Sequence, residues 1–99
     1  MTVNYFIENV LLPEINSKNS RHFALNYHSL QYPVYIKSDQ EKICLAIENC
    51  GFHVRVGIAG KYKGRQGLQI IVFECSKEMK FNCMFTDQIS GEIEFGVNS

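Results

Sequence analysis

The chain has 99 residues, of which 45% are hydrophobic and 12% aromatic, and its formal net charge at pH 7 is zero. This length suits a single domain with one modest core, and the composition excludes a disordered or collagen-like chain. The neutral charge also argues against a generally basic nucleic-acid-binding domain. We therefore expect one globular domain over residues 1–99.

The first predicted element is an amphipathic helix at the N-terminus, where apolar residues recur at intervals of three and four. Thr2 precedes this pattern as a candidate N-cap. Pro13 deprives the carbonyl of Asn9 of its helical donor. The helix is therefore expected to end between Leu12 and Asn16, after a break or a short kinked turn.

Two strands are predicted next. Apolar and polar residues alternate in the segment 21–28, which is the period of a half-buried strand. The short segment 32–37 is expected to follow as a second strand, with Pro33 at a sheet edge or a bulge. Together the two segments would form a hairpin.

Residues 38–51 hold the clearest local signal in the chain. Ser38 and Glu41 have the spacing of a capping box, in which each side chain satisfies a free amide at the start of a helix. Gly51 supplies the left-handed residue that commonly ends a helix. We predict a helix over about 39–50.

Four further strands are predicted in the second half of the chain, over 52–58, 68–75, 81–86 and 91–97. Their short connections favour an antiparallel meander. The order helix, two strands, helix, four strands makes an α+β domain. Two helices are expected to pack on one face of a mainly antiparallel sheet of about six strands.

The strand 68–75 is apolar on both faces, whereas the two helices cover only one face of the sheet. A connection centred near Lys63 places the following residues together on the helix-facing side: Val54, Val56 and Ile58 beside Leu68, Ile70 and Val72. The opposite face would then hold four residues: His53, Arg55, Ile71 and Phe73. The predicted N-terminal hairpin could cover this face, but an apolar patch with a polar border is typical of a partner surface, so we expect a second copy or another protein to bind there.

The glycine-rich connection 59–67 is the second candidate surface, because it carries cations and no acid. Its candidate contacts are Lys61, Tyr62, Lys63 and Arg65. The cations would neutralise phosphates and the tyrosine ring would stack on a base, which predicts nucleic-acid binding as the alternative function. The segment lacks the Ser or Thr of a phosphate-binding P-loop, so nucleotide hydrolysis is not indicated.

No catalytic or metal-binding group of residues is expected. His22 and His28 lie about 20 Å apart along one predicted strand, which is too far for one metal ion. Cys50 and His53 are close in sequence, but Cys50 falls at the negative end of its predicted helix, where ionisation of a thiol is disfavoured. We therefore predict neither an enzyme nor a cofactor.

The sequence gives no sign of export or membrane insertion. No basic leader precedes the N-terminal apolar residues, and Glu8 lies among them. The longest aliphatic or aromatic run is 70–73, far shorter than the ~20 residues that cross a bilayer. We expect a cytoplasmic protein with reduced cysteines; across a hairpin, Cys75 and Cys83 are the local pair whose geometry would allow a disulfide.

The predicted function is that of a small non-enzymatic interaction protein, either a homodimer or the inhibitor or adaptor of another macromolecule. Nucleic-acid binding through 59–67 and small-ligand binding between the helices and the sheet are the alternatives. In size and lack of motif the chain also resembles the accessory products of bacterial mobile elements, integron gene cassettes among them. That resemblance rests on length and not on any residue.

Overall fold

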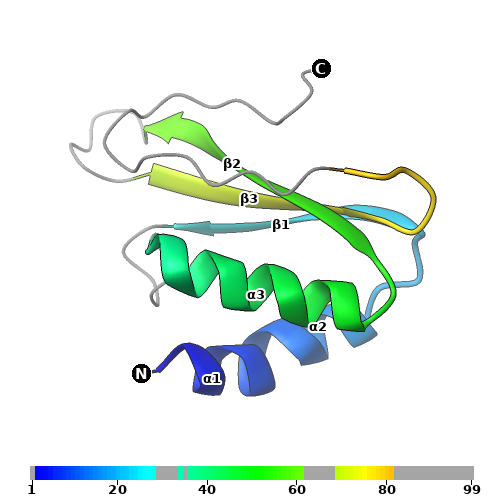
Figure 1. The fold of residues 1–99 in the computed structure, drawn as a ribbon, viewed down its shortest axis with the longest axis horizontal. Coiled ribbons are helices and arrows are strands. Elements are labelled where there is room, and N and C mark those ends of the chain that lie inside the picture. Colours follow the sequence, from blue (N-terminus) through cyan, green and yellow to red (C-terminus); the bar gives the residue numbers. More distant parts are fainter. Residues whose placement is uncertain (1, 29–33, 35, 62–68, 82–99) are drawn as a thin grey trace.

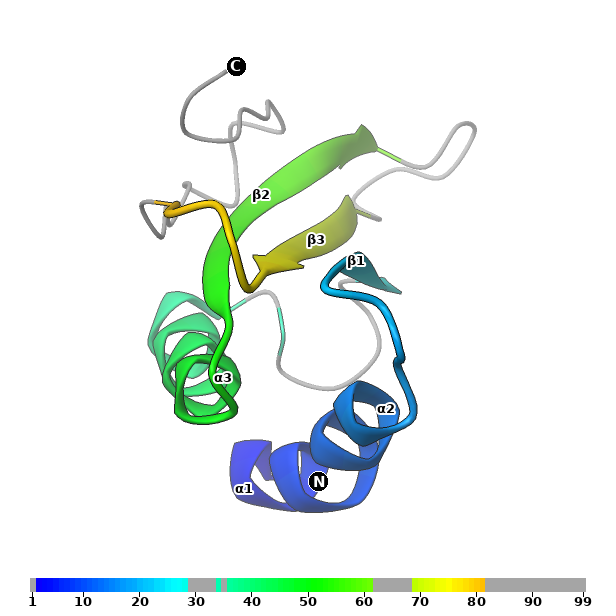
Figure 2. The same cartoon turned by 90° about the vertical axis from the view of Figure 1, so that its right-hand side faces the viewer.

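The structure is a computed structural model that describes residues 2–28, 34, 36–61 and 69–81. Helices lie on one side of a three-stranded antiparallel sheet, as Figure 1 and Figure 2 show from two directions. The elements in chain order are α1 (Val3–Phe6), the π-helix η1 (Ile7–Leu11), α2 (Leu12–Asn16), β1 (His22–His28), α3 (Lys37–Asn49), β2 (His53–Lys61) and β3 (Gln69–Ser76). The predicted α+β class is confirmed.

The elements α1, η1 and α2 form one helical segment with a widened turn in its middle. The hydroxyl of Thr2 accepts a hydrogen bond from the backbone amide of Tyr5 at 3.1 Å, which confirms the predicted N-cap. The π-helical turn directly precedes α2, where Pro13 can donate no hydrogen bond and its ring crowds the preceding turn. The segment continues to Asn16, within the predicted limits.

The prediction of a strand over 32–37 is wrong for the residues of this segment that the structure describes, 34, 36 and 37. Val34 is fully buried outside any strand, Ile36 is the N-cap of α3, and Lys37 is the first residue of that helix. The buried side chain of Gln40 donates to the carbonyl of Val34 at 2.9 Å. This tertiary contact holds Val34 against the core, outside any strand.

The start of α3 also differs from the prediction. The backbone amides of Asp39 and Gln40 donate to the carbonyl of Ile36, so the helix begins before Ser38 and no side chain caps it. The expected capping box of Ser38 with Glu41 is therefore not the N-terminus of this helix. The C-terminus of α3 agrees with the prediction: the helix ends at Asn49, and Gly51 after it has the left-handed φ of 95° that commonly follows a helix.

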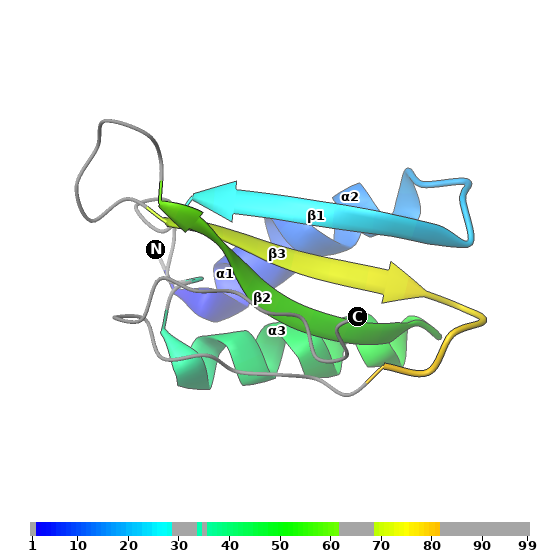
Figure 3. The ribbon, with the colours of Figure 1, turned by 90° about the horizontal axis from the view of Figure 1, so that it is seen from above.

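Strand β3 lies between β1 and β2 and pairs antiparallel with both, as Figure 3 shows from above. Phe73 lies opposite Leu25 on one side and opposite Val56 on the other. The predicted order of six strands is not supported, since the described residues form three. The strands expected over 81–86 and 91–97 lie outside the described residues, except for Phe81, which is not in a strand.

The core fills the space between the sheet and the helices. Its fully buried members come from every layer: Phe6 and Leu11 from the first helical segment, Ile43 and Ile47 from α3, and Leu25, Ile71 and Phe73 from the sheet. The ring of Tyr27 meets that of Phe6 edge to face at 5.1 Å. Its hydroxyl donates to Oε1 of Glu14 at 2.6 Å, which ties β1 to α2.

Candidate functional site

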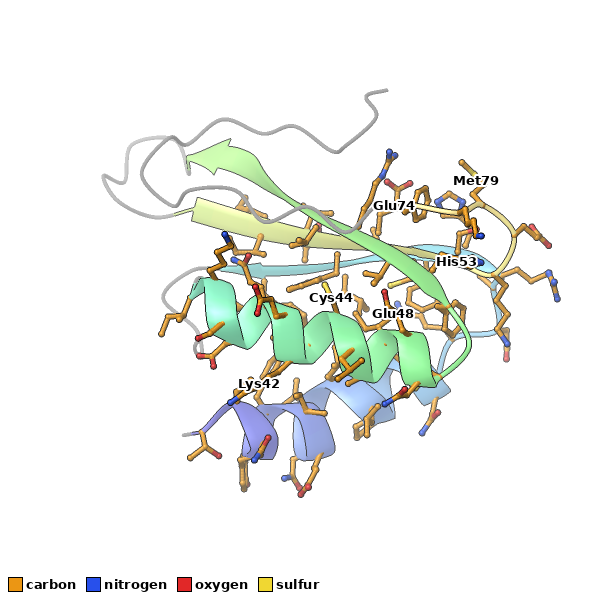
Figure 4. The ribbon with its side chains drawn as sticks, in the orientation of Figure 1. Lys42, Cys44, Glu48, His53, Glu74 and Met79 are labelled. Carbon is orange, nitrogen blue, oxygen red and sulfur yellow. The ribbon has the colours of Figure 1, made fainter. Side chains whose placement is uncertain are left out.

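We call the face of the sheet opposite the helices the outer face. The strand residues described as exposed or half-buried on this face are His22, Ala24 and Asn26 on β1, Ile70, Val72 and Glu74 on β3, and His53 and Arg55 on β2. Figure 4 shows Glu74 on the side of the sheet away from α3, with Cys44 between α3 and the sheet. Ile70 and Val72 are half-buried, and they are the apolar residues of the central strand on this face.

The structure does not bring the four predicted partner-binding residues together. His53 and Arg55 lie on the outer face as expected, but Ile71 and Phe73 have 0% exposure and belong to the core, so their predicted placement is wrong. The reason is the register of β2 with β3. Val56 pairs with Phe73 instead of Ile70. Because this shift covers an odd number of residues, it exchanges the two faces of β3.

A cluster of three charged or titratable side chains spans all three strands on the outer face. Arg55 on β2 donates through Nε and Nη2 to Oε1 of Glu74, at 2.8 and 2.7 Å. Nε2 of His22 on β1 lies 2.8 Å from the other carboxylate oxygen, Oε2. Both oxygens of Glu74 are therefore engaged, and the cluster joins the two edge strands through the central one.

This environment changes the acidity of Glu74. Burial alone would raise the pKa of its carboxyl group, but the hydrogen bonds from His22 and Arg55 and the charges of both outweigh burial and lower the pKa. A carboxylate that is more acidic than usual and already bonded through both oxygens is a poor general base. The cluster therefore fits a structural or binding role better than proton transfer.

Phe81, which follows β3, lies against two residues of the outer face. The ring of Phe81 lies 4.5 Å from the guanidinium carbon of Arg55, and 6.2 Å from the ring of His22. The guanidinium thus meets a carboxylate on one side and an aromatic ring on another, an arrangement that suits the planar, weakly hydrated arginine head group. Arg55 is consequently held in a fixed position on this face.

The predicted nucleic-acid contacts fall almost wholly outside the described residues. Lys61 is the last residue of β2 and pairs with Gln69 after a break in register that begins at Ile58. Tyr62, Lys63 and Arg65 lie outside the described residues, so binding through 59–67 stays a prediction. The predicted small-ligand site between helices and sheet coincides with the apolar core described above.

The described thiols have a structural character. Burial, together with the nearby Glu74 and Cys50, raises the pKa of Cys75 to about 12. Cys50 is the C-cap of α3, as predicted, and no disulfide joins Cys44, Cys50 and Cys75 to one another. The partner suggested for Cys75, Cys83, lies outside the described residues. Among the described residues no three His, Cys, Asp or Glu side chains gather in a way that would hold a metal ion.

No protein-family model, curated protein or solved structure matches this chain. None of the helices in the described part of the chain has the length and apolar character needed to cross a membrane.

The cluster around Glu74 was missed by reasoning from sequence, although a signal for it exists. Glu74 is the one acid in the segment 68–75, and Arg55 is the one Lys or Arg in 52–58. Opposite charges isolated in two apolar segments that are expected to pair predict a cross-strand ion pair. The assignment needed the correct register, which sets Arg55 directly opposite Glu74.

Proposed function

We propose that this chain is a non-enzymatic interaction protein that binds a second copy of itself through the outer face. The observation that carries the proposal is the half-buried apolar pair Ile70 and Val72 on the central strand, on the side away from the helices. The cluster of Glu74 with Arg55 and His22 borders this pair. Apolar residues with a polar border are the usual composition of a protein-binding surface.

The cluster also favours association on physical grounds. Its side chains already make their hydrogen bonds within one chain, so a partner does not have to immobilise them, and the entropy cost of binding is smaller. Arg55 and Glu74 carry opposite charges and neutralise one another. Two such faces can therefore approach without net repulsion, as a twofold-symmetric dimer requires.

The apolar pair alone gives a weak dimer. Covering the exposed parts of Ile70 and Val72 would contribute roughly 1–3 kcal/mol per protomer, and the loss of translational and rotational freedom offsets several kcal/mol. Further contacts around the pair are needed for a stable complex. We therefore expect a dimer whose population depends on concentration.

Substitution of Val72 tests the proposal. Val72→Glu should convert a dimer into a folded monomer in light scattering, with its far-ultraviolet circular dichroism unchanged, because a charge cannot be buried in the interface without a partner. Val72→Thr, which keeps the branched shape, is the matched control and should stay dimeric at high concentration. A wild type that is monomeric at every concentration refutes the binding of a second copy.

The likeness in size to mobile-element accessory products stays a hypothesis, since no described residue bears on it. Nucleic-acid binding through 59–67 likewise stays a prediction. Its test is the salt dependence of oligonucleotide binding, because neutralisation of phosphates releases counterions.

A further inference from the structure

A second surface lies at the end of the sheet where β1 and β2 begin and β3 ends, on the right in Figure 1 and facing the viewer in Figure 2. Two connecting segments meet there, 17–21 before β1 and 77–81 after β3. The backbone amide of Lys77 donates to the carbonyl of Arg21 at 2.9 Å, and Arg21 also forms an ion pair with Glu78. We call this surface the basic end, and its lysines are Lys18, Lys77 and Lys80.

The second connecting segment is held in one conformation by a buried side chain. The hydroxyl of Ser76 accepts hydrogen bonds from the backbone amides of Glu78 and Met79, at 3.1 and 3.0 Å. Ser76 itself is 1% exposed. The turn therefore presents its lysines from a fixed backbone, which lowers the entropy cost of binding a ligand.

Two of the lysines lie against a pair of aromatic rings. The amino group of Lys77 is 4.8 Å from the ring centre of Phe52, and that of Lys18 is 5.7 Å from the ring centre of Phe23. The two rings meet edge to face at 5.0 Å. Residues from three separate parts of the chain thus place two ammonium groups on one aromatic pair.

These positive charges have no carboxylate partner in the described structure. The two connecting segments carry four cations and one acid, Glu78, which pairs with Arg21. Lys18, Lys77 and Lys80 are exposed and form no ion pair with the described residues. An aromatic ring orients an ammonium group but leaves its N–H donors available for an anion.

The surroundings favour a polypeptide over a nucleic acid as the source of that anion. Single-stranded nucleic acids stack on open aromatic faces, whereas Phe52 is buried and both rings have a lysine beside them. Met79 is 49% exposed beside the lysines and offers an apolar contact. Figure 4 shows Met79 at this end of the molecule.

We propose that the basic end binds an acidic segment of a partner polypeptide, with carboxylates on Lys18, Lys77 and Lys80 and an apolar side chain on Met79. The three lysines and Met79 are not residues of the outer face, so binding of the acidic segment does not require a dimer. The charges of site and ligand are complementary, and such complementarity mainly increases specificity and the rate of association.

The probe is a labelled peptide with a repeated Glu-Glu-Leu pattern, measured by fluorescence anisotropy on the full chain at low salt. Wild type should bind it, should not bind the same peptide with Gln in place of Glu, and should lose affinity as salt is added. Lys18→Ala with Lys77→Ala should weaken binding by about fivefold or more, the effect expected when two exposed charge contacts are lost. Lys42→Ala is the matched control, since Lys42 is exposed on the side of α3 away from the sheet.

Two further variants separate charge from folding. Lys80→Ala removes a charge and leaves the ring contacts of Lys18 and Lys77 in place, and it should weaken binding by about twofold. Lys77→Arg keeps the charge and should keep binding. No binding of the acidic peptide to wild type overturns the proposal, as does an equal loss in Lys42→Ala. The proposal is overturned in favour of nucleic acid if a single-stranded oligonucleotide binds more tightly than the peptide and loses affinity in Lys18→Ala with Lys77→Ala.

Discussion

Truncation of Phe73 tests the register on which both faces of the sheet depend. Its side chain has 0% exposure, and its position in the central strand lies between Leu25 and Val56. Its ring also lies 6.3 Å from that of Tyr27. Phe73→Ala removes a large buried side chain and leaves a cavity, which costs about 3–5 kcal/mol of the free energy of unfolding.

That loss is large for a chain of this size. A domain of 99 residues has a free energy of unfolding of roughly 5–15 kcal/mol, so Phe73→Ala removes a substantial part of it. Val72→Ala is the matched control, because Val72 is the preceding residue, points to the outer face and is half-buried. It should cost about 1 kcal/mol or less beyond its small loss of strand propensity.

Urea denaturation followed by circular dichroism measures both variants at the same protein concentration. The difference should appear as a lower midpoint for Phe73→Ala with a similar slope, since the surface exposed on unfolding changes little. Equal losses for the two variants, or a greater loss for Val72→Ala, would mean that the register is wrong and that Phe73 belongs to the outer face.

Two further predictions concern the end of α3 and the cluster on the outer face. Gly51→Val should lower the free energy of unfolding by about 1 kcal/mol or more, and Gly51→Asn by less, because a β-branched residue is strained at a φ of 95°. The strain lies in the backbone, since a Cβ added at this position meets no atom within 4 Å. Equal midpoints of the two variants in thermal denaturation would contradict this reasoning. Glu74→Gln should lose stability relative to wild type above pH 4.5, the ordinary pKa of the group, and this difference should vanish as the pH falls through the lower pKa of Glu74 in the folded protein. The exposed Glu41→Gln is its control, and a difference for Glu74→Gln that grows toward low pH would contradict the assigned direction of the shift.

The features that sequence reasoning placed correctly are those with a local cause. Thr2 caps a helix because its hydroxyl reaches an amide three residues away, and Gly51 ends one because it tolerates a positive φ. The alternation over 21–28 predicted β1, with Leu25 and Tyr27 buried, because the strand period is set by the backbone itself. None of these assignments requires knowledge of distant residues.

The predictions that were wrong concern features that depend on contacts between distant parts of the chain. The segment 32–37 contains residues that favour strands, but Val34 is buried against the core with a hydrogen bond from Gln40, and Lys37 already begins α3. The register of β2 with β3 depends on the connection between Lys61 and Gln69 and on the irregularity after Ile58. In a strand, alternate residues point to opposite faces of the sheet, so either set could face the core. When both sets are apolar, the sequence does not show which one does.

The set of β3 residues that faces the helices therefore determines both the core and the candidate interface. If Ile71 and Phe73 face the helices, Ile70, Val72 and Glu74 must face outward, and Arg55 comes to lie opposite Glu74. The ion pair then supports the facing, because the reverse arrangement would bury a carboxylate and a guanidinium in the core at high cost. The same alternation that stabilises the core thus leaves the apolar pair on the outer face, where binding of a second chain is the proposed means of covering it.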